Sequence, residues 1–243
     1  MAEYALKKDA LDKEPLDRLE AQLFASPFVA DSPLQGTFEG SRGFAVIFTE
    51  AGRAELEARF PYLSPFLDAV LDEGLHTRLL SLTDRWKKRR PRRANAFYLN
   101  LLLLGPGNFV GRHVDATLRD ASGVKGALPE RVAVLYLRVP TRRGGELLLF
   151  RHRAPVGRIA PRRGSVVVFR GELAHEVRPF ESDAEGALRA SLVLEQYALE
   201  GDALARLPPL KVCSKAGFAA YLKCAQDPDF KQETEATHRT RSI

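Results

Sequence analysis

A triplet near the middle of the chain, His113-Val114-Asp115, combines two residue types that bind metal ions. On a β-strand alternate side chains share one face, so the imidazole and the carboxylate would point the same way. A second histidine, His175, follows an apolar run that ends at Phe169. Two imidazoles and one carboxylate leave three adjacent octahedral positions open, which iron(II) needs to hold a bidentate co-substrate and dioxygen.

The spacing alone does not decide the chemistry, because a His-x-Asp triplet also arises by chance. The remaining histidines have no partner at ligand spacing. His76 lies in a predicted helix, His152 stands between two arginines, and His238 is in the polar tail. We predict that these three are solvated or structural.

The elements that would position a metal site begin at residue 96, where the sequence pattern changes. From there the chain consists of short apolar runs divided by glycine and proline, a pattern that predicts the strands of a sandwich or barrel, of which the jelly roll is one form. These runs are 96–104, 132–139, 146–150, 165–169 and 190–197.

The first ninety residues are predicted to be mainly helical. Apolar residues recur at spacings of three and four in 54–60 and 66–71, and Ser64-Pro65 is typical of a helix cap and first turn. A loop is expected at 32–36 and a strand at 43–48. After residue 201 the pattern is helical again, including 218–222, and the polar tail 231–243 is expected to fray.

Length and composition predict one domain. The 243 residues, 45% of them hydrophobic, can bury one substantial core. We expect a mainly helical N-terminal support in 1–95, a jelly-roll core in 96–197, and a helical C-terminal extension with a polar tail in 198–243.

The chain has no apolar run of about eighteen residues, and its N-terminus is charged where a signal peptide would be apolar. We therefore expect a soluble, cytoplasmic protein with no membrane partner. Cys213 and Cys224 are the only cysteines, so we expect reduced thiols rather than a disulfide framework or a four-ligand zinc site.

Seven basic residues lie within 85–93 and contribute much of the net charge of +6. A charge run of this kind is usually a solvated loop, which is the favoured interpretation. The alternative is a dedicated patch for an anion or a nucleic acid.

Four stretches carry a family resemblance. They are the glycine-containing approach to the histidine triplet in 105–115, the strand 131–137 followed by Gly144-Gly145-Glu146, the segment 161–177 with the distal histidine, and Arg189-Ala190-Ser191. In this order they resemble the motifs of the Fe(II)/2-oxoglutarate-dependent oxygenase superfamily, in its prolyl 4-hydroxylase-like branch. The resemblance covers about residues 96–197.

The resemblance implies a mainly β fold with flanking helices, built on a double-stranded β-helix, the jelly-roll core shared with cupins. It implies that His113, Asp115 and His175 bind Fe(II). It also implies that 2-oxoglutarate chelates the iron through its keto acid end, with dioxygen as the second co-substrate.

The far carboxylate of 2-oxoglutarate is expected to meet Arg189, with Ser191 as the second member of the family's Arg-x-Ser. A guanidinium pairs with a carboxylate bidentately and stays charged when desolvated. The alternative for Arg189 is an exposed strand arginine. Many relatives use a tyrosine where Leu104 stands, so Tyr136 is the substitute candidate, with a core aromatic as the equal alternative.

Tyr98 and Asn100 share strand parity with Leu104, which would turn them inward as co-substrate or substrate contacts or as members of a buried polar network.

The reaction implied by the family is decarboxylation of 2-oxoglutarate to succinate coupled to hydroxylation of an unactivated carbon. Halogenating relatives lack the carboxylate ligand, so Asp115 favours hydroxylation. A peptide, a protein or an amino-acid-like small molecule is the expected substrate, although no residue specifies which amino acid.

Three alternatives remain. A cupin-like metal-binding sensor would keep the barrel without oxidation, but it would not need Arg189. An oxidative nucleic-acid demethylase is less favoured, because two of its signature positions are occupied by 102–104 and by Glu195. A basic nucleic-acid-binding module would need a reading element beside 85–93, where only Trp86 offers itself.

Overall fold

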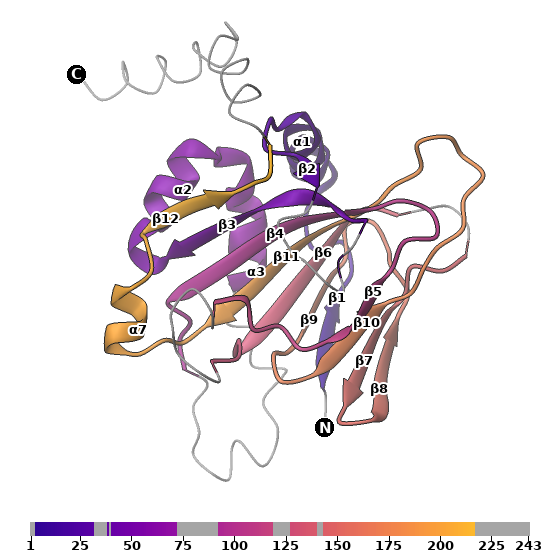
Figure 1. Cartoon of the computed structure of the whole chain (residues 1–243). Helices are drawn as coiled ribbons and strands as arrows, with labels where there is room; N and C mark the ends of the chain where they lie inside the picture. Colours follow the sequence, from indigo (N-terminus) through magenta and orange to yellow (C-terminus); the bar gives the residue numbers. More distant parts are fainter. Residues whose placement is uncertain are drawn as a thin grey trace, which may run out of the picture.

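The computed structural model describes residues 3–31, 38, 40–71, 92–118, 127–139 and 143–216. Its frame is a pair of antiparallel sheets that face each other, with helices against the outer face of the larger one (Figure 1). Two facing antiparallel sheets are the arrangement of a jelly roll.

The large sheet contains the long buried strands. Its order is β1-β9-β6-β11-β4-β3-β12, with β2 paired to β3. The strands are β1 (Tyr4–Lys7), β2 (Ala30–Asp31), β3 (Arg42–Thr49), β4 (Ala96–Leu104), β6 (Arg131–Arg138), β9 (Val166–Arg170), β11 (Arg189–Tyr197) and β12 (Leu210–Cys213).

The small sheet has the order β5-β10-β7-β8. Its strands are β5 (Val110–His113), β7 (Leu147–Arg151), β8 (Ala154–Ile159) and β10 (Ala174–Val177). Both histidines of the predicted metal site lie on it.

The helices lie mostly in the N-terminal part of the chain. They are α1 (Lys13–Ala25), α2 (Arg53–Arg59), α3 (Ser64–Leu71) and α7 (Gly201–Ala205), with 3-10 turns at Glu50–Gly52 and Pro61–Leu63. Helices α1, α2 and α3 bury their leucine, phenylalanine and valine side chains against one face of the large sheet. They support that sheet from outside and leave its other face to the site.

Alternation along β4 and β11 divides the core in two. Residues 97, 99, 101 and 103 of β4 pack on the helix side, whereas Leu102 and Leu104 pack between the sheets. On β11, residues 190, 192 and 194 face the helices. Arg189, Ser191 and Glu195 have the opposite parity and therefore point toward the small sheet.

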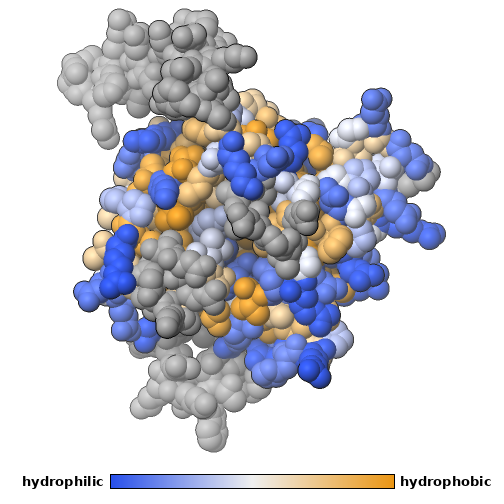
Figure 2. All heavy atoms as spheres, in the orientation of Figure 1, coloured by the Kyte–Doolittle hydropathy of each residue, from blue (hydrophilic) through white to orange (hydrophobic). Residues whose placement is uncertain are grey.

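Hydrophilic side chains border the face shown in Figure 2, and hydrophobic side chains gather in patches between them. Among the described residues, no helix is both long and apolar enough to span a bilayer.

The five predicted core strands are all present, within a residue or two of their predicted ends. The predicted helices at 54–60 and 66–71 and the strand at 43–48 are confirmed by α2, α3 and β3. The loop 32–36, the helix 218–222 and the tail lie outside the described residues.

The flanking regions contain strands that the helical pattern did not predict. In the N-terminal part, β1 pairs with β9 and β2 pairs with β3 in the large sheet, so this region does more than support it. After α7 the chain forms β12 rather than helix and pairs with β3. Four residues are too few to show a strand period, so the exposed edge of β3 decided their conformation.

A tight turn at Gly144-Gly145 leads into β7. Gly144 has φ +94°, and a Cβ there would lie 2.2 Å from the carbonyl oxygen of Pro179. Gly145 has φ +74°, and its Cβ would lie 3.2 Å from Cδ of Arg189. The turn therefore needs two glycines, one for the close backbone approach and one for the arginine beside it.

Replacing Gly144 with alanine should destabilise the fold more than replacing Gly107. Gly107 also has a positive φ, +78°, but nothing lies within 4 Å of its Cβ position. Gly107→Ala should lower the free energy of unfolding by roughly 1–2 kcal/mol. Gly144→Ala should lower it by roughly 1–3 kcal/mol more because of the clash. Urea denaturation of both variants measures the difference, and equal losses would contradict the close approach.

Candidate metal centre

His113 and His175 face each other across two neighbouring strands. His113 ends β5, His175 lies in β10, and their Cα atoms are direct partners in the antiparallel register. The ring centroids are 4.3 Å apart. Directly opposed residues point to the same side of a sheet, so both imidazoles point in one direction.

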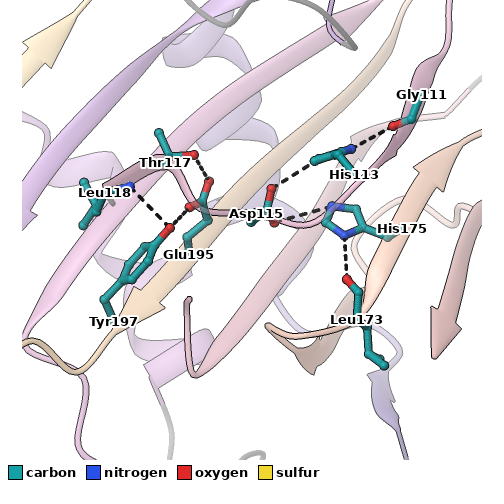
Figure 3. Close-up of polar contacts among 9 residues, drawn as sticks. All are labelled: Gly111, His113, Asp115, Thr117, Leu118, Leu173, His175, Glu195 and Tyr197. Carbon is teal, nitrogen blue, oxygen red and sulfur yellow. Dashed lines mark hydrogen bonds and ion pairs between the residues drawn. The ribbon is translucent and has the colours of Figure 1, made fainter. Parts of the chain in front are cut away.

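Asp115 completes the group from beyond the end of β5. The prediction placed it on one strand with His113; instead, β5 ends at His113 and Asp115 reaches the histidines from the following loop. Its Oδ1 lies 3.3 Å from Nε2 of His113, and its Oδ2 lies 3.4 Å from Nε2 of His175 (Figure 3). Ligand atoms of the three residues lie within 4.8 Å of one another, a separation that one metal ion can bridge.

Backbone carbonyls orient both imidazoles. Nδ1 of His113 lies 2.8 Å from the carbonyl oxygen of Gly111, and Nδ1 of His175 lies 3.2 Å from that of Leu173. A carbonyl can only accept, so each Nδ1 carries the proton and each Nε2 is left with its lone pair. This is the usual outer partner of a metal-binding histidine.

Two polar atoms at the centre of the group lack a hydrogen bond within the described part of the chain. Nε2 of His113 and Oδ2 of Asp115 are fully buried and have no hydrogen-bond partner among the described residues. Buried polar atoms are nearly always satisfied, and a metal ion at this point would satisfy both. The donor set of two imidazoles and one carboxylate fits iron(II).

The charges within the group are mutually dependent. Burial would raise the pKa of Asp115, but the neighbouring His175 and His113 lower it below its usual value. Burial would lower the pKa of His113, yet the adjacent Asp115 carboxylate raises it. Burial lowers the pKa of His175 despite Asp115. The Asp115 carboxylate therefore stays ionised, and the imidazole of His113 holds its proton more tightly than that of His175.

The group opens into a narrow cavity between the two sheets. Its polar lining includes Arg189, Ser191, Asn100 and Glu195, all from the inner face of the large sheet, together with the three residues of the group. The cavity is about 40 Å³, room for about two or three water molecules. A larger ligand would therefore have to move side chains apart.

Arg189 is buried, with 1% of its surface exposed, which contradicts the alternative of an exposed strand arginine. Its Nε donates to the carbonyl oxygen of Gly145 at 3.0 Å, and its Nη1 donates to the Ser191 hydroxyl at 3.0 Å. Its guanidinium carbon lies 5.3 Å from the ring centroid of Tyr136. Among the described residues, no carboxylate forms an ion pair with this buried cation within 4.0 Å.

Tyr136 and Leu104 lie beside this arginine. Leu104 is buried directly opposite Arg189 on the neighbouring strand. The buried hydroxyl of Tyr136 has no well-formed hydrogen bond among the described residues. Burial raises the pKa of Tyr136, and the charge of Arg189 opposes that shift.

Asn100 and Tyr98 share the inward parity that the sequence predicted, but they lie at different places. Asn100 lines the cavity, and Tyr98 packs in a separate cluster farther along β4. Burial, with the charge of Glu195, raises the pKa of Tyr98.

Glu195 and Phe38 are among the cavity residues that were not predicted as site residues. Glu195 is buried and shares the strand parity of Arg189 and Ser191, which is a signal that the sequence did contain. Burial and the nearby Asp115 raise its pKa, against hydrogen bonds from Tyr197 and Thr117. Phe38 packs edge-on against the ring of His113, and only the tertiary structure shows that contact.

The other polar features that were singled out lie outside the cavity. His152 is exposed in the turn between β7 and β8, whereas His76 and His238 lie outside the described residues. Of the basic segment only Arg92 and Arg93 are described, and they form surface ion pairs with Glu200 and Glu50. Cys213 is a free thiol, and Cys224 is not described.

A comparison with protein families identifies the segment that contains the metal-binding group. Residues 96–194 match the family model described as the 2OG-Fe(II) oxygenase superfamily. This segment of the chain belongs to that superfamily. Fe(II), 2-oxoglutarate and dioxygen are thus the cofactor and co-substrates of this oxygenase. No curated protein sequence matches it.

Solved structures with the same fold include prolyl hydroxylases. A Pseudomonas putida prolyl-4-hydroxylase is 21% identical with a TM-score of 0.53, covering 80% of this oxygenase and 91% of that chain. A Trichoplax adhaerens prolyl hydroxylase, solved with a hypoxia inducible factor peptide fragment, is 16% identical with a TM-score of 0.53, covering 80% and 83%.

The viral collagen prolyl hydroxylase of Paramecium Bursaria Chlorella virus-1, solved as a 2OG complex, is 17% identical with a TM-score of 0.51, covering 82% of this oxygenase and 97% of that chain. At these identities the likeness shows the fold, which is the predicted double-stranded β-helix.

Metal binding by this oxygenase should weaken on acidification. A metal binds the neutral imidazole, so it must displace the proton that Asp115 helps His113 to hold. Because the pKa of His113 is raised above the ordinary histidine value of 6.5, protons begin to compete with the metal ion above that pH. Below that pH, Mn(II) affinity should fall about tenfold per unit. Mn(II) titrations from about pH 8 to about pH 5.5 test this, with circular dichroism as the control for folding. An affinity that stays constant over this range would contradict proton competition.

Proposed function

We propose that this oxygenase hydroxylates an unactivated carbon of an amino-acid residue in a peptide or protein, or of a free amino-acid-like molecule. The observation that carries the proposal is the position of the buried Arg189 guanidinium in the same cavity as the His113, Asp115 and His175 group. An uncompensated buried cation is costly unless it receives an anion. A dicarboxylate that reaches from the metal to Arg189 supplies that anion.

In this proposal His113, Asp115 and His175 are the metal ligands. The two imidazoles present Nε2, and Asp115 contributes the negative charge that offsets part of the charge of the metal. The bound iron supplies the oxidising chemistry. The presence of the carboxylate, which halogenating relatives lack, supports hydroxylation as the outcome.

Arg189 receives the far carboxylate of 2-oxoglutarate. Its present bonds to the Gly145 carbonyl and the Ser191 hydroxyl fix the plane of the guanidinium and leave further N–H groups for a carboxylate. Tyr136 contributes a hydroxyl beside it, and Asn100 lines the same cavity. Tyr98 is proposed as a more remote inward contact. Aliphatic residues around them exclude water from the reacting centre.

Support for the substrate class comes from the proteins that share this fold. The Trichoplax adhaerens prolyl hydroxylase was solved with a peptide, and two further neighbours are prolyl hydroxylases by name. Peptidyl substrates are therefore the first to test.

Alanine at any metal ligand should abolish turnover and weaken metal binding. We expect His113→Ala, Asp115→Ala and His175→Ala each to lose succinate formation and to bind Mn(II) at least about tenfold more weakly. Asp115→Gly should lose hydroxylation while keeping the fold. His152→Asn is the matched control, because His152 is exposed and asparagine tolerates its positive φ of 56°. Full activity in any ligand variant would refute the assignment.

Arg189→Gln should raise the KM for 2-oxoglutarate about 10- to 100-fold, since a buried charge-assisted pair contributes roughly 1.5–3 kcal/mol. Tyr136→Phe should raise it about tenfold or less, since one neutral hydroxyl bond contributes about 1 kcal/mol. Arg178→Gln is the matched control, because Arg178 lies on the surface and pairs with Glu176. If Arg178→Gln alone changed the KM, the co-substrate would bind on the outer face instead.

The substrate class is tested by succinate formation from 2-oxoglutarate in the presence of Fe(II), with and without candidate substrates. We expect proline-containing peptides or free amino acids to stimulate turnover and to gain one oxygen atom in the mass spectrum. Methylated oligonucleotides are the comparison set. Stimulation by those alone would favour the demethylase, and metal binding without any turnover would favour a cupin-like sensor.

A further inference from the structure

A chain of polar contacts lies beside Asp115, on the side away from the two histidines (Figure 3). The Thr117 hydroxyl donates to Oε1 of Glu195 at 2.7 Å. The Tyr197 hydroxyl donates to Oε2 of the same carboxyl. The backbone N–H of Leu118 lies 3.4 Å from the Tyr197 hydroxyl and donates to it. These contacts join the loop after Asp115 to strand β11.

Asp115 needs such support because the sheet does not hold it. The two histidines are fixed by the β5-β10 pairing and by backbone carbonyls. Asp115 lies beyond the last paired residue of β5, and the only described partners of its carboxylate are the two imidazoles. Those contacts would be replaced by metal bonds. The direction of the carboxylate must therefore come from the backbone that carries it.

Burying the Glu195 carboxyl and the Tyr197 hydroxyl costs free energy, which indicates that the contacts between them have a functional role. Glu195 has 3% of its surface exposed and Tyr197 has none. A buried carboxyl destabilises a fold unless both oxygens are satisfied. Here each oxygen accepts one hydroxyl, one from the loop and one from β11. An apolar residue would fill the same space without that cost.

Glu195 is not itself suited to the metal or to the substrate. The potential metal-binding group among the described residues comprises His113, Asp115 and His175 without Glu195. Although Glu195 lines the cavity, both of its oxygens are already occupied by Thr117 and Tyr197. Its geometry is that of a brace between strand and loop.

We propose that Glu195, Thr117 and Tyr197 are positioning residues that hold the loop after Asp115 against β11, so that the Asp115 carboxylate stays directed at the metal position. The inference rests on the proposed assignment of Asp115 as a metal ligand. The brace acts on the metal end of the cavity and leaves the Arg189 end unaffected.

The test compares Thr117→Val, which removes only the hydroxyl, with Thr117→Ser, which keeps it. The dissociation constant for Mn(II) alone should rise about tenfold in Thr117→Val and in Tyr197→Phe, and should stay within about twofold of wild type in Thr117→Ser. At saturating metal, the KM for 2-oxoglutarate should remain unchanged. The absorption spectrum of the Co(II) form should shift in the two weakened variants, because it reports the ligand geometry.

Ser214→Ala is the control for a merely structural effect. Its hydroxyl donates to the carbonyl oxygen of Phe28, away from the cavity. It should lower the unfolding midpoint without changing Mn(II) affinity. Wild-type Mn(II) affinity and an unchanged Co(II) spectrum in both Thr117→Val and Tyr197→Phe would overturn the proposal.

The Asp115→Ala variant distinguishes the metal-ligand assignment of Asp115 from the proposed brace. If it binds Mn(II) as tightly as wild type, the ligand assignment itself fails. If it loses binding while Thr117→Val and Tyr197→Phe do not, only the brace is refuted. Combining Thr117→Val with Glu195→Gln should weaken binding no more than the stronger single change, because both remove the same link.

Discussion

The pairing of β5 with β10 is the interaction on which the site depends. It places His113 opposite His175, and a shift of one residue would turn one imidazole to the far side of the sheet. Strand β10 is held from both sides, because it also pairs with β7, where Leu149 lies opposite His175. The apolar side chains between the sheets thus fix the register that brings the imidazoles together.

The inner face of β11 gives the cavity two polar ends. Arg189 and Ser191 lie at one end, near the Gly144-Gly145 turn, and Glu195 lies at the other, near the loop of Asp115. The same alternation sends the intervening residues into the core beneath the helices. One strand therefore carries both the cation proposed to bind a dicarboxylate and the carboxyl proposed to brace the metal end, while its other face stabilises the fold.

Most of the core strands could be predicted from residue patterns, whereas the expected roles of the site residues came from the resemblance to a known family. Strands 96–104 and 190–197 are mainly apolar stretches of strand length, and the stretches beside them in the sequence are divided by glycine and proline. Parity along β11 indicated that Arg189 and Ser191 share a face, and both are buried at the cavity. The glycine pair at 144–145 was expected only as part of a family motif, and the structure adds the reason, because a Cβ on Gly144 would lie too close to the backbone at Pro179.

The sequence by itself determined the pattern of residue types along each strand. It showed which side chains alternate, where turns interrupt the strands, and that two histidines and an aspartate are available. The tertiary structure alone decided which of them meet. Asp115 reaches the histidines from a loop, β1 and β12 join the large sheet, and Glu195 finds Thr117 across 78 residues of chain. Local periodicity reports only the face of a strand, whereas partners distant in sequence are selected by sheet register and by burial of the whole core.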